Sequence, residues 1–124
     1  MPAEVPVPLM AAAFPILPQK TADWRKFIDE LNGPRHAEFM ESRRRAGVQE
    51  RTFLQSTPMG DLAVVTLEGD DPQKGFQQIV SATDPFSMWF LERVKDIHGV
   101  DLTKQDMKPP EQVIDSARPA VMAK

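Results

Sequence analysis

Two histidines are the side chains of this sequence whose protonation changes most easily near neutral pH. His36 and His98 stand 62 positions apart, with no HExxH or His-x-His pattern around either, so they do not predict a metal site. His98 ends an apolar helical stretch, where it could act as a general base or an axial haem ligand. The commoner role at that place is a cation that stabilises the last carbonyls of the helix. His36 could line a cleft, although a solvent-facing position is favoured.

Charged groups offer two further hypotheses. The run Arg43-Arg44-Arg45 could bind an anion, but it closes a helical stretch, where solvated cations beside the negative helix end are the usual explanation. Asp71 and Asp84 could form a carboxylate pair. Each stands directly before a proline, however, and this favours two helix caps, each followed by proline at the first helical position.

Aromatic residues could form the wall of a ligand pocket. The candidates are Trp24, Trp89, Phe39 and Phe86. Trp24 and Trp89 both occupy apolar helical faces, so packing in the core is the alternative and commoner role.

Several chemistries are excluded by the residues that are missing. The chain has no cysteine, no glycine-rich nucleotide motif and no Gly-x-Ser-x-Gly nucleophile turn, so no metal and no cofactor is expected. A formal net charge of −3 and a segment 62–67 without aromatic or basic residues argue against nucleic-acid binding. No apolar stretch is long enough to span a membrane, and no signal-peptide pattern is found, so a cytoplasmic location is expected.

The elements that must position these side chains follow from local patterns. A length of 124 residues and 41% hydrophobic residues predict one domain over 1–124, with its core in about 8–117. Strands are predicted at 8–14, 48–55 and 62–67, the last two forming a hairpin around Thr57–Asp61. A helix is predicted from Thr21, its N-cap, with a break at Asn32-Gly33-Pro34. Helices follow Asp71-Pro72 and Asp84-Pro85, and Val113-Ile114 is the candidate for a short last strand.

This order of elements predicts an α+β fold of the ferredoxin-like split βαβ type, with an antiparallel sheet, a kinked first helix and a broken second helix. The strands are apolar on both faces: Leu62, Val64 and Thr66 point one way, and Ala63, Val65 and Leu67 the other. Helices can cover one face only. The other face is therefore expected to pack on a second copy of the chain, with coverage by its own last 25 residues as the alternative.

Three short sequence segments resemble those of a known superfamily: Arg44-Arg45-Ala46-Gly47-Val48, Asp84-Pro85-Phe86, and Ile97-His98-Gly99-Val100-Asp101-Leu102. Across about residues 8–117 the chain resembles uncharacterised small bacterial proteins of the dimeric α/β-barrel superfamily. The resemblance implies a homodimer in which two sheets share a barrel. The superfamily includes cofactor-free monooxygenases, muconolactone isomerases and haem-degrading enzymes, but no catalytic motif is matched.

Two functions are therefore carried forward. The first is a dimeric protein that binds a small apolar molecule between sheet and helices. The second is a cofactor-free monooxygenase or isomerase that acts on an aromatic or polyketide-like molecule, with His36, His98 and an arginine as its only candidate polar groups. Haem binding through His98 is a weaker third.

Overall fold

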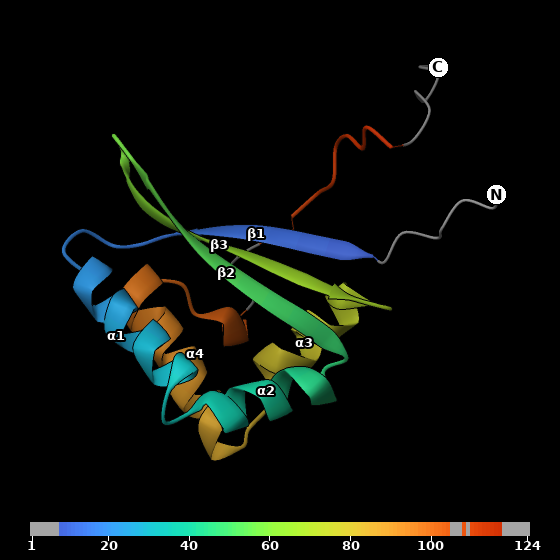
Figure 1. Ribbon diagram of the computed structural model, residues 1–124, viewed down its shortest axis with the longest axis horizontal. Coiled ribbons are helices and arrows are strands. Elements are labelled where there is room, and N and C mark those ends of the chain that lie inside the picture. Colours follow the sequence, from blue (N-terminus) through green and yellow to red (C-terminus); the bar gives the residue numbers. More distant parts are fainter. Residues whose placement is uncertain (1–7, 105–107, 109, 118–124) are drawn as a thin grey trace.

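The computed structural model describes residues 8–104, 108 and 110–117, and within them it shows an α+β fold with a three-stranded antiparallel sheet and four helices (Figure 1). The elements are, in chain order, β1 (Leu9–Pro15), α1 (Thr21–Asn32), α2 (His36–Arg45), β2 (Val48–Thr57), β3 (Gly60–Gly69), α3 (Pro72–Ser81), α4 (Pro85–His98) and a 3₁₀ turn (Leu102–Lys104).

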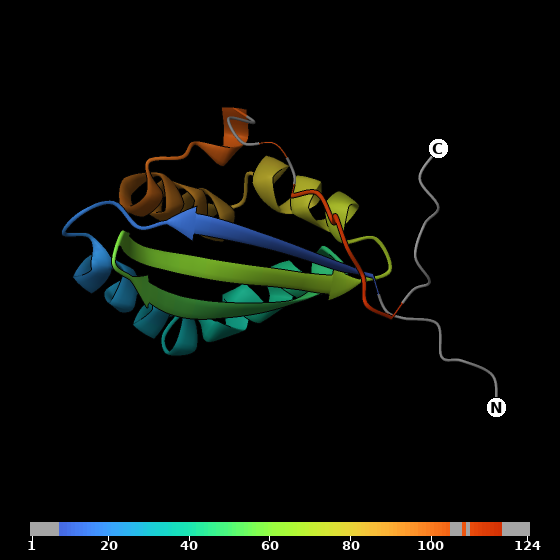
Figure 2. The same cartoon turned by 90° about the horizontal axis from the view of Figure 1, so that it is seen from above.

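Strand β3 lies in the middle of the sheet and pairs antiparallel with both β1 and β2. Val65 therefore stands between Ala12 of β1 and Thr52 of β2. Strands β1 and β2 therefore run in the same direction, with β3 inserted between them. All four helices lie on one face of the sheet (Figure 1), with α1 and α2 on the β2 side and α3 and α4 on the β1 side (Figure 2).

The predicted helix boundaries at the two aspartates are confirmed. Asp71 accepts a hydrogen bond from the backbone N–H of Lys74 at 3.0 Å, and Asp84 accepts one from Ser87 at 3.2 Å. Both are N-caps followed by proline at the start of a helix. The hairpin is also confirmed, with a tighter connection than expected, since β2 ends at Thr57 and β3 begins at Gly60.

The predicted break at Pro34 is confirmed as well, because α1 ends at Asn32 and α2 begins at His36. Pro34 lies in the turn between the helices rather than at the first position of α2. The prediction that Thr21 caps α1 is wrong. Lys20 occupies the cap position without a side-chain bond, and the Thr21 hydroxyl instead donates to Asp61 Oδ2 at 2.6 Å, which ties α1 to the hairpin.

The prediction of a last strand at Val113-Ile114 is also wrong. These residues belong to no strand, and 81% and 83% of their surface is exposed. Their apolar run is only two residues long, and a strand that short has too few ladder bonds and too little buried surface to hold an edge position. Pro110, just before it, has no backbone N–H to donate to a neighbouring strand.

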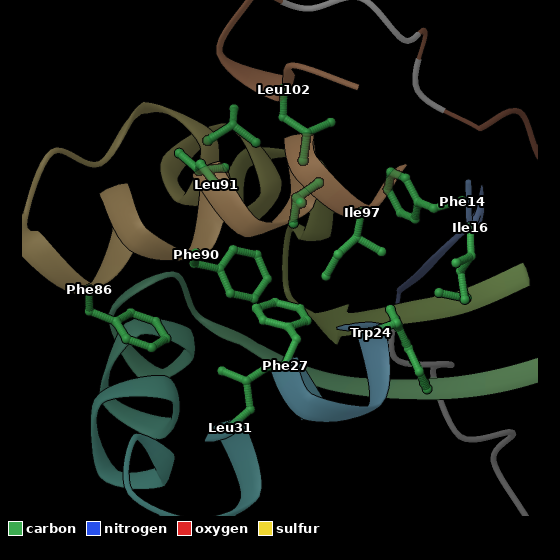
Figure 3. Close-up of a cluster of buried hydrophobic side chains, with 13 residues drawn as sticks. Phe14, Ile16, Trp24, Phe27, Leu31, Phe86, Phe90, Leu91, Ile97 and Leu102 are labelled. Atoms are coloured by element: carbon green, nitrogen blue, oxygen red, sulfur yellow. The ribbon is translucent and has the colours of Figure 1, made fainter. Parts of the chain in front are cut away.

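The core lies between the sheet and the helices (Figure 3). Alternate residues of the strands point into it, among them Phe14, Ala63 and Leu67, which are 8%, 2% and 4% exposed. The apolar faces of α1 and α4 meet Phe14 and Ala63, whereas Leu67 packs with Ile79 of α3 in a second cluster. The buried members from the helices include Trp24, Phe27, Leu31, Phe86, Phe90, Leu91, Val94 and Ile97.

The opposite face of the sheet carries apolar side chains that no described helix covers (Figure 1). At its centre Val64 pairs with Ala13 on one side and with Phe53 on the other, and Phe53 is 54% exposed. The described C-terminal residues run on this side of the sheet over the start of β1, not over this centre (Figure 2). Pro110 to Gln112 line a surface hollow beside the starts of β1 and α3.

A membrane-spanning helix is not found within the described ranges, since none there is both long and apolar enough.

Candidate functional site

A cavity lies between the helix-facing side of the sheet and the helices. Its volume is about 70 Å³, and its wall is mostly apolar. Aromatic side chains come from β1, α1, α3 and α4: Phe14, Trp24, Phe27, Phe76 and Phe90. Four hydrogen-bonding side chains besides the Trp24 indole also reach this wall: Arg43, Glu50, Thr52 and His98.

Arg43 and Glu50 form a buried ion pair in this wall. The Arg43 Nε donates to Glu50 Oε1 at 2.7 Å, and the two side chains are only 6% and 8% exposed. The second oxygen of Glu50 accepts a hydrogen bond from the Thr52 hydroxyl at 3.2 Å, and Arg43 Nη1 donates to the Ser42 hydroxyl at 2.8 Å. A charged pair in an apolar wall is costly to desolvate.

Aromatic rings hold the guanidinium of Arg43 in place. Its central carbon lies 4.5 Å from the ring centre of Phe90 and 4.8 Å from that of Phe39. Such contacts stabilise a desolvated cation through the negative ring faces. The guanidinium is thus fixed by two rings, a carboxylate and a hydroxyl.

The sequence interpretation of the arginine run is wrong for its first member. Arg44 and Arg45 have exposed side chains, as expected, but Arg43 points inward from the last turn of α2 and meets β2. Glu50 was not identified as a site residue. The available signal was strand alternation, which places Glu50 on the same face as buried Val48 and therefore toward the helices.

His98 is buried, with 8% of its surface exposed, and its Nδ1 donates to the Pro15 carbonyl at 2.8 Å. A carbonyl can only accept, so Nδ1 carries the proton and, in the neutral ring, Nε2 is left as an acceptor. Burial lowers the pKa of His98, and the bond to Pro15 only partly offsets this effect. The prediction that His98 is a cation at the end of its helix is therefore wrong. His98 is neutral at pH 7, and it contacts β1 instead of the helix carbonyls.

His36 lies elsewhere. It begins α2 on the exposed surface, donates from Nδ1 to the Leu31 carbonyl at 2.9 Å, and does not line the cavity. The structure therefore places only one of the two candidate histidines at the cavity.

Of the four aromatic residues predicted to line a pocket, the structure likewise places only one at the cavity. Trp24 lines the cavity, whereas Trp89, Phe39 and Phe86 are not among its lining residues. Trp89 packs against Phe27 and Phe86, with ring centres 5.5 and 5.8 Å apart. The guanidinium of Arg35 covers its outer side, 4.1 Å from the ring centre.

No group of three or more potential metal ligands occurs in the described part of the chain. Asp71 and Asp84 cap separate helices, and the hydrogen bond from the Ser87 hydroxyl lowers the pKa of Asp84. The cavity is thus an apolar space with one buried ion pair and one neutral histidine. Such an arrangement can bind an apolar molecule and orient it by a few polar contacts.

No protein-family model matches this chain, and comparison with curated proteins and with solved structures gives no match either.

Proposed function

We propose that this protein binds a small, mostly apolar molecule in the cavity between its sheet and its helices. The observation that carries the proposal is the buried Arg43–Glu50 pair in an otherwise apolar cavity wall. Well-packed apolar residues of similar volume usually serve stability as well as a buried ion pair does, or better. Stability therefore does not account for charged side chains at this position, whereas the binding of a ligand does.

Naphthalene, a rigid bicyclic probe, tests the proposal by NMR. The chain has two tryptophans, and only Trp24 lines the cavity. We expect naphthalene to shift the indole N–H signal of Trp24 in a saturable manner and to shift that of Trp89 much less. The absence of a saturable Trp24 shift would contradict the proposal.

Two valines on neighbouring positions of β3 provide a matched pair of variants. Val65 lines the cavity, and Val64 lies on the opposite face of the sheet. Val65→Phe should fill the cavity and abolish the Trp24 shift, whereas Val64→Phe should retain it. Equal binding by both variants would place the probe elsewhere.

The second candidate function is a cofactor-free monooxygenase or isomerase. Its specific support is His98, which lines the cavity as a neutral ring whose Nε2 can accept a proton. Enolisable ketones exchange their α-hydrogens when a base removes them, so deuterium uptake by 2-tetralone in D₂O tests this role. Enzymatic exchange should be lost in His98→Gln, and an equal rate in both proteins would contradict it.

We further propose that the chain forms a homodimer through the open sheet face, as in the dimeric α/β barrels of ferredoxin-like type. The apolar centre of that face, Ala13, Val64 and Phe53, supports this, since a bare apolar sheet face is rare in monomers. Sedimentation should show one species of twice the chain mass, with an interface on the order of 2,000 Å² in total. Val64→Glu should dissociate it, whereas Gln49→Glu at the end of the same face should not. A single species near 13.9 kDa at micromolar concentration would contradict the dimer.

A further inference from the structure

Arg43 uses few of its hydrogen-bond donors. A guanidinium has five N–H groups. Within the described residues only two of these have acceptors, namely Glu50 for Nε and the Ser42 hydroxyl for Nη1. The neighbouring Arg44 differs, because both its Nε and its Nη2 bind the carboxylate of Glu41. The arginine therefore binds one carboxylate oxygen and one hydroxyl, and its Nη2 group has no acceptor in the described part of the chain. No completely buried side-chain nitrogen there lacks a partner, so Nη2 is open to solvent.

The other polar groups of the cavity wall are already committed. The Thr52 hydroxyl donates to Glu50, and the Nδ1–H of His98 donates to Pro15. The remaining unpaired side-chain donors among the lining residues described are the Arg43 guanidinium and the indole N–H of Trp24. Of these two, the charged guanidinium forms the stronger hydrogen bond.

Net charge decides which kind of acceptor fits. Arg43 and Glu50 neutralise each other in a wall that contributes no other charge. A carboxylate bound there would bring an uncompensated negative charge into an apolar space, which is costly. A carbonyl oxygen accepts the same hydrogen bond without adding charge.

From this we infer that the ligand is a neutral apolar molecule with a carbonyl oxygen that accepts a hydrogen bond from Arg43, a ketone, aldehyde or ester rather than a carboxylic acid. The inference rests on the proposed binding function and specifies its ligand class. The rings of Phe14, Trp24, Phe27 and Phe90 favour a flat ligand body, because aromatic faces stack on one another.

Three probes of the same shape test it: naphthalene, 2-acetonaphthone and 2-naphthoate, each titrated while the Trp24 indole signal is followed. We expect 2-acetonaphthone to bind the unaltered protein about tenfold more tightly than the other two, because hydrogen bonds to charged donors are among the stronger ones. The ¹³C signal of its labelled carbonyl should also move downfield on binding.

The variant Glu50→Gln should reverse the preference for the neutral ketone over the carboxylate. It keeps the side-chain shape and an acceptor oxygen for Arg43 but removes the compensating charge, so 2-naphthoate should become the tightest ligand. Glu41→Gln on the exposed face of α2 is the control, and it should leave the order unchanged. If Glu50→Gln does not fold, the order measured on the unaltered protein decides alone.

The outcomes separate the two proposals. If naphthalene binds the unaltered protein as tightly as 2-acetonaphthone, or if 2-naphthoate binds it most tightly, the carbonyl inference is overturned while the apolar cavity function stands. If none of the probes shifts the Trp24 signal, both fall.

Discussion

The buried pair of Arg43 and Glu50 yields the sharpest stability prediction. Arg43→Met keeps much of the side-chain volume and removes the charge, leaving a carboxylate that is 8% exposed with only the Thr52 hydroxyl as a donor. Glu50→Met leaves the guanidinium without its counter-ion. Removing one partner of a buried pair costs about 3–5 kcal/mol, and we expect each single variant to fall in this range.

The double variant should behave differently, because it removes both charges together. Replacing both Arg43 and Glu50 by methionine leaves no buried charge, and we expect a loss of less than about 2 kcal/mol, part of it from the Thr52 hydroxyl that loses its acceptor. The coupling between the two sites should therefore be large.

Urea unfolding of the four proteins at one fixed concentration measures these quantities. With a typical dependence of stability on urea, each single variant should lower the midpoint by about 2 M. The Arg44 and Glu41 pair is the control, because it lies on the same helix but is 73% and 49% exposed, and its double-variant cycle should show little coupling. Additive single losses at Arg43 and Glu50, each under about 1 kcal/mol, would refute the reasoning that this pair is buried and mutually dependent.

Three further predictions follow from other parts of the fold. His98 has a lowered pKa in the folded state, so the unfolded chain binds a proton that the folded chain does not as the pH falls through about 6.5. The free energy of unfolding should therefore decrease between about pH 7 and pH 5, and this decrease should be absent in His98→Gln; parallel pH profiles of the two proteins would contradict it. Gly75→Ala should destabilise the protein although alanine favours helices, because the new Cβ would lie 2.6 Å from Val48 Cγ1 and 2.8 Å from the Ala46 carbonyl oxygen. A raised melting temperature would show that α3 can move away from β2. Leu67→Asp should reduce stability several times more than a surface substitution, because it would bury an unpaired carboxylate at a position that is 4% exposed. A Leu67→Asp variant that folds and melts like the parent would disprove the burial of β3.

The local chemistry of the sequence determined the elements of this fold. Asp71 and Asp84 before prolines begin helices because a carboxylate can cap a free N–H two or three residues ahead and proline tolerates the first turn. Gly47 and Gly99 have φ values of 71° and 72° just past the helices, a conformation that glycine adopts without strain. Pro34 divides the first helical region for an equally local reason, since its ring prevents a continuous helix. These features depend on neighbours within a few residues, so they could be predicted.

The last strand could not be predicted in the same way, because a strand forms only when a partner edge accepts it. Two apolar residues, Val113 and Ile114, satisfy the local preference but have no ladder in the described structure.

The candidate site was decided by tertiary structure. Nothing within the run of three arginines separates Arg43 from its neighbours; only the packing of α2 over β2 turns Arg43 inward onto Glu50, seven residues away. His98 is neutral because α4 ends against β1, where Pro15 supplies an acceptor 83 residues distant in sequence and the surroundings exclude water. Burial and charge compensation arise from contacts between distant segments, and such contacts come into existence only when the chain has folded.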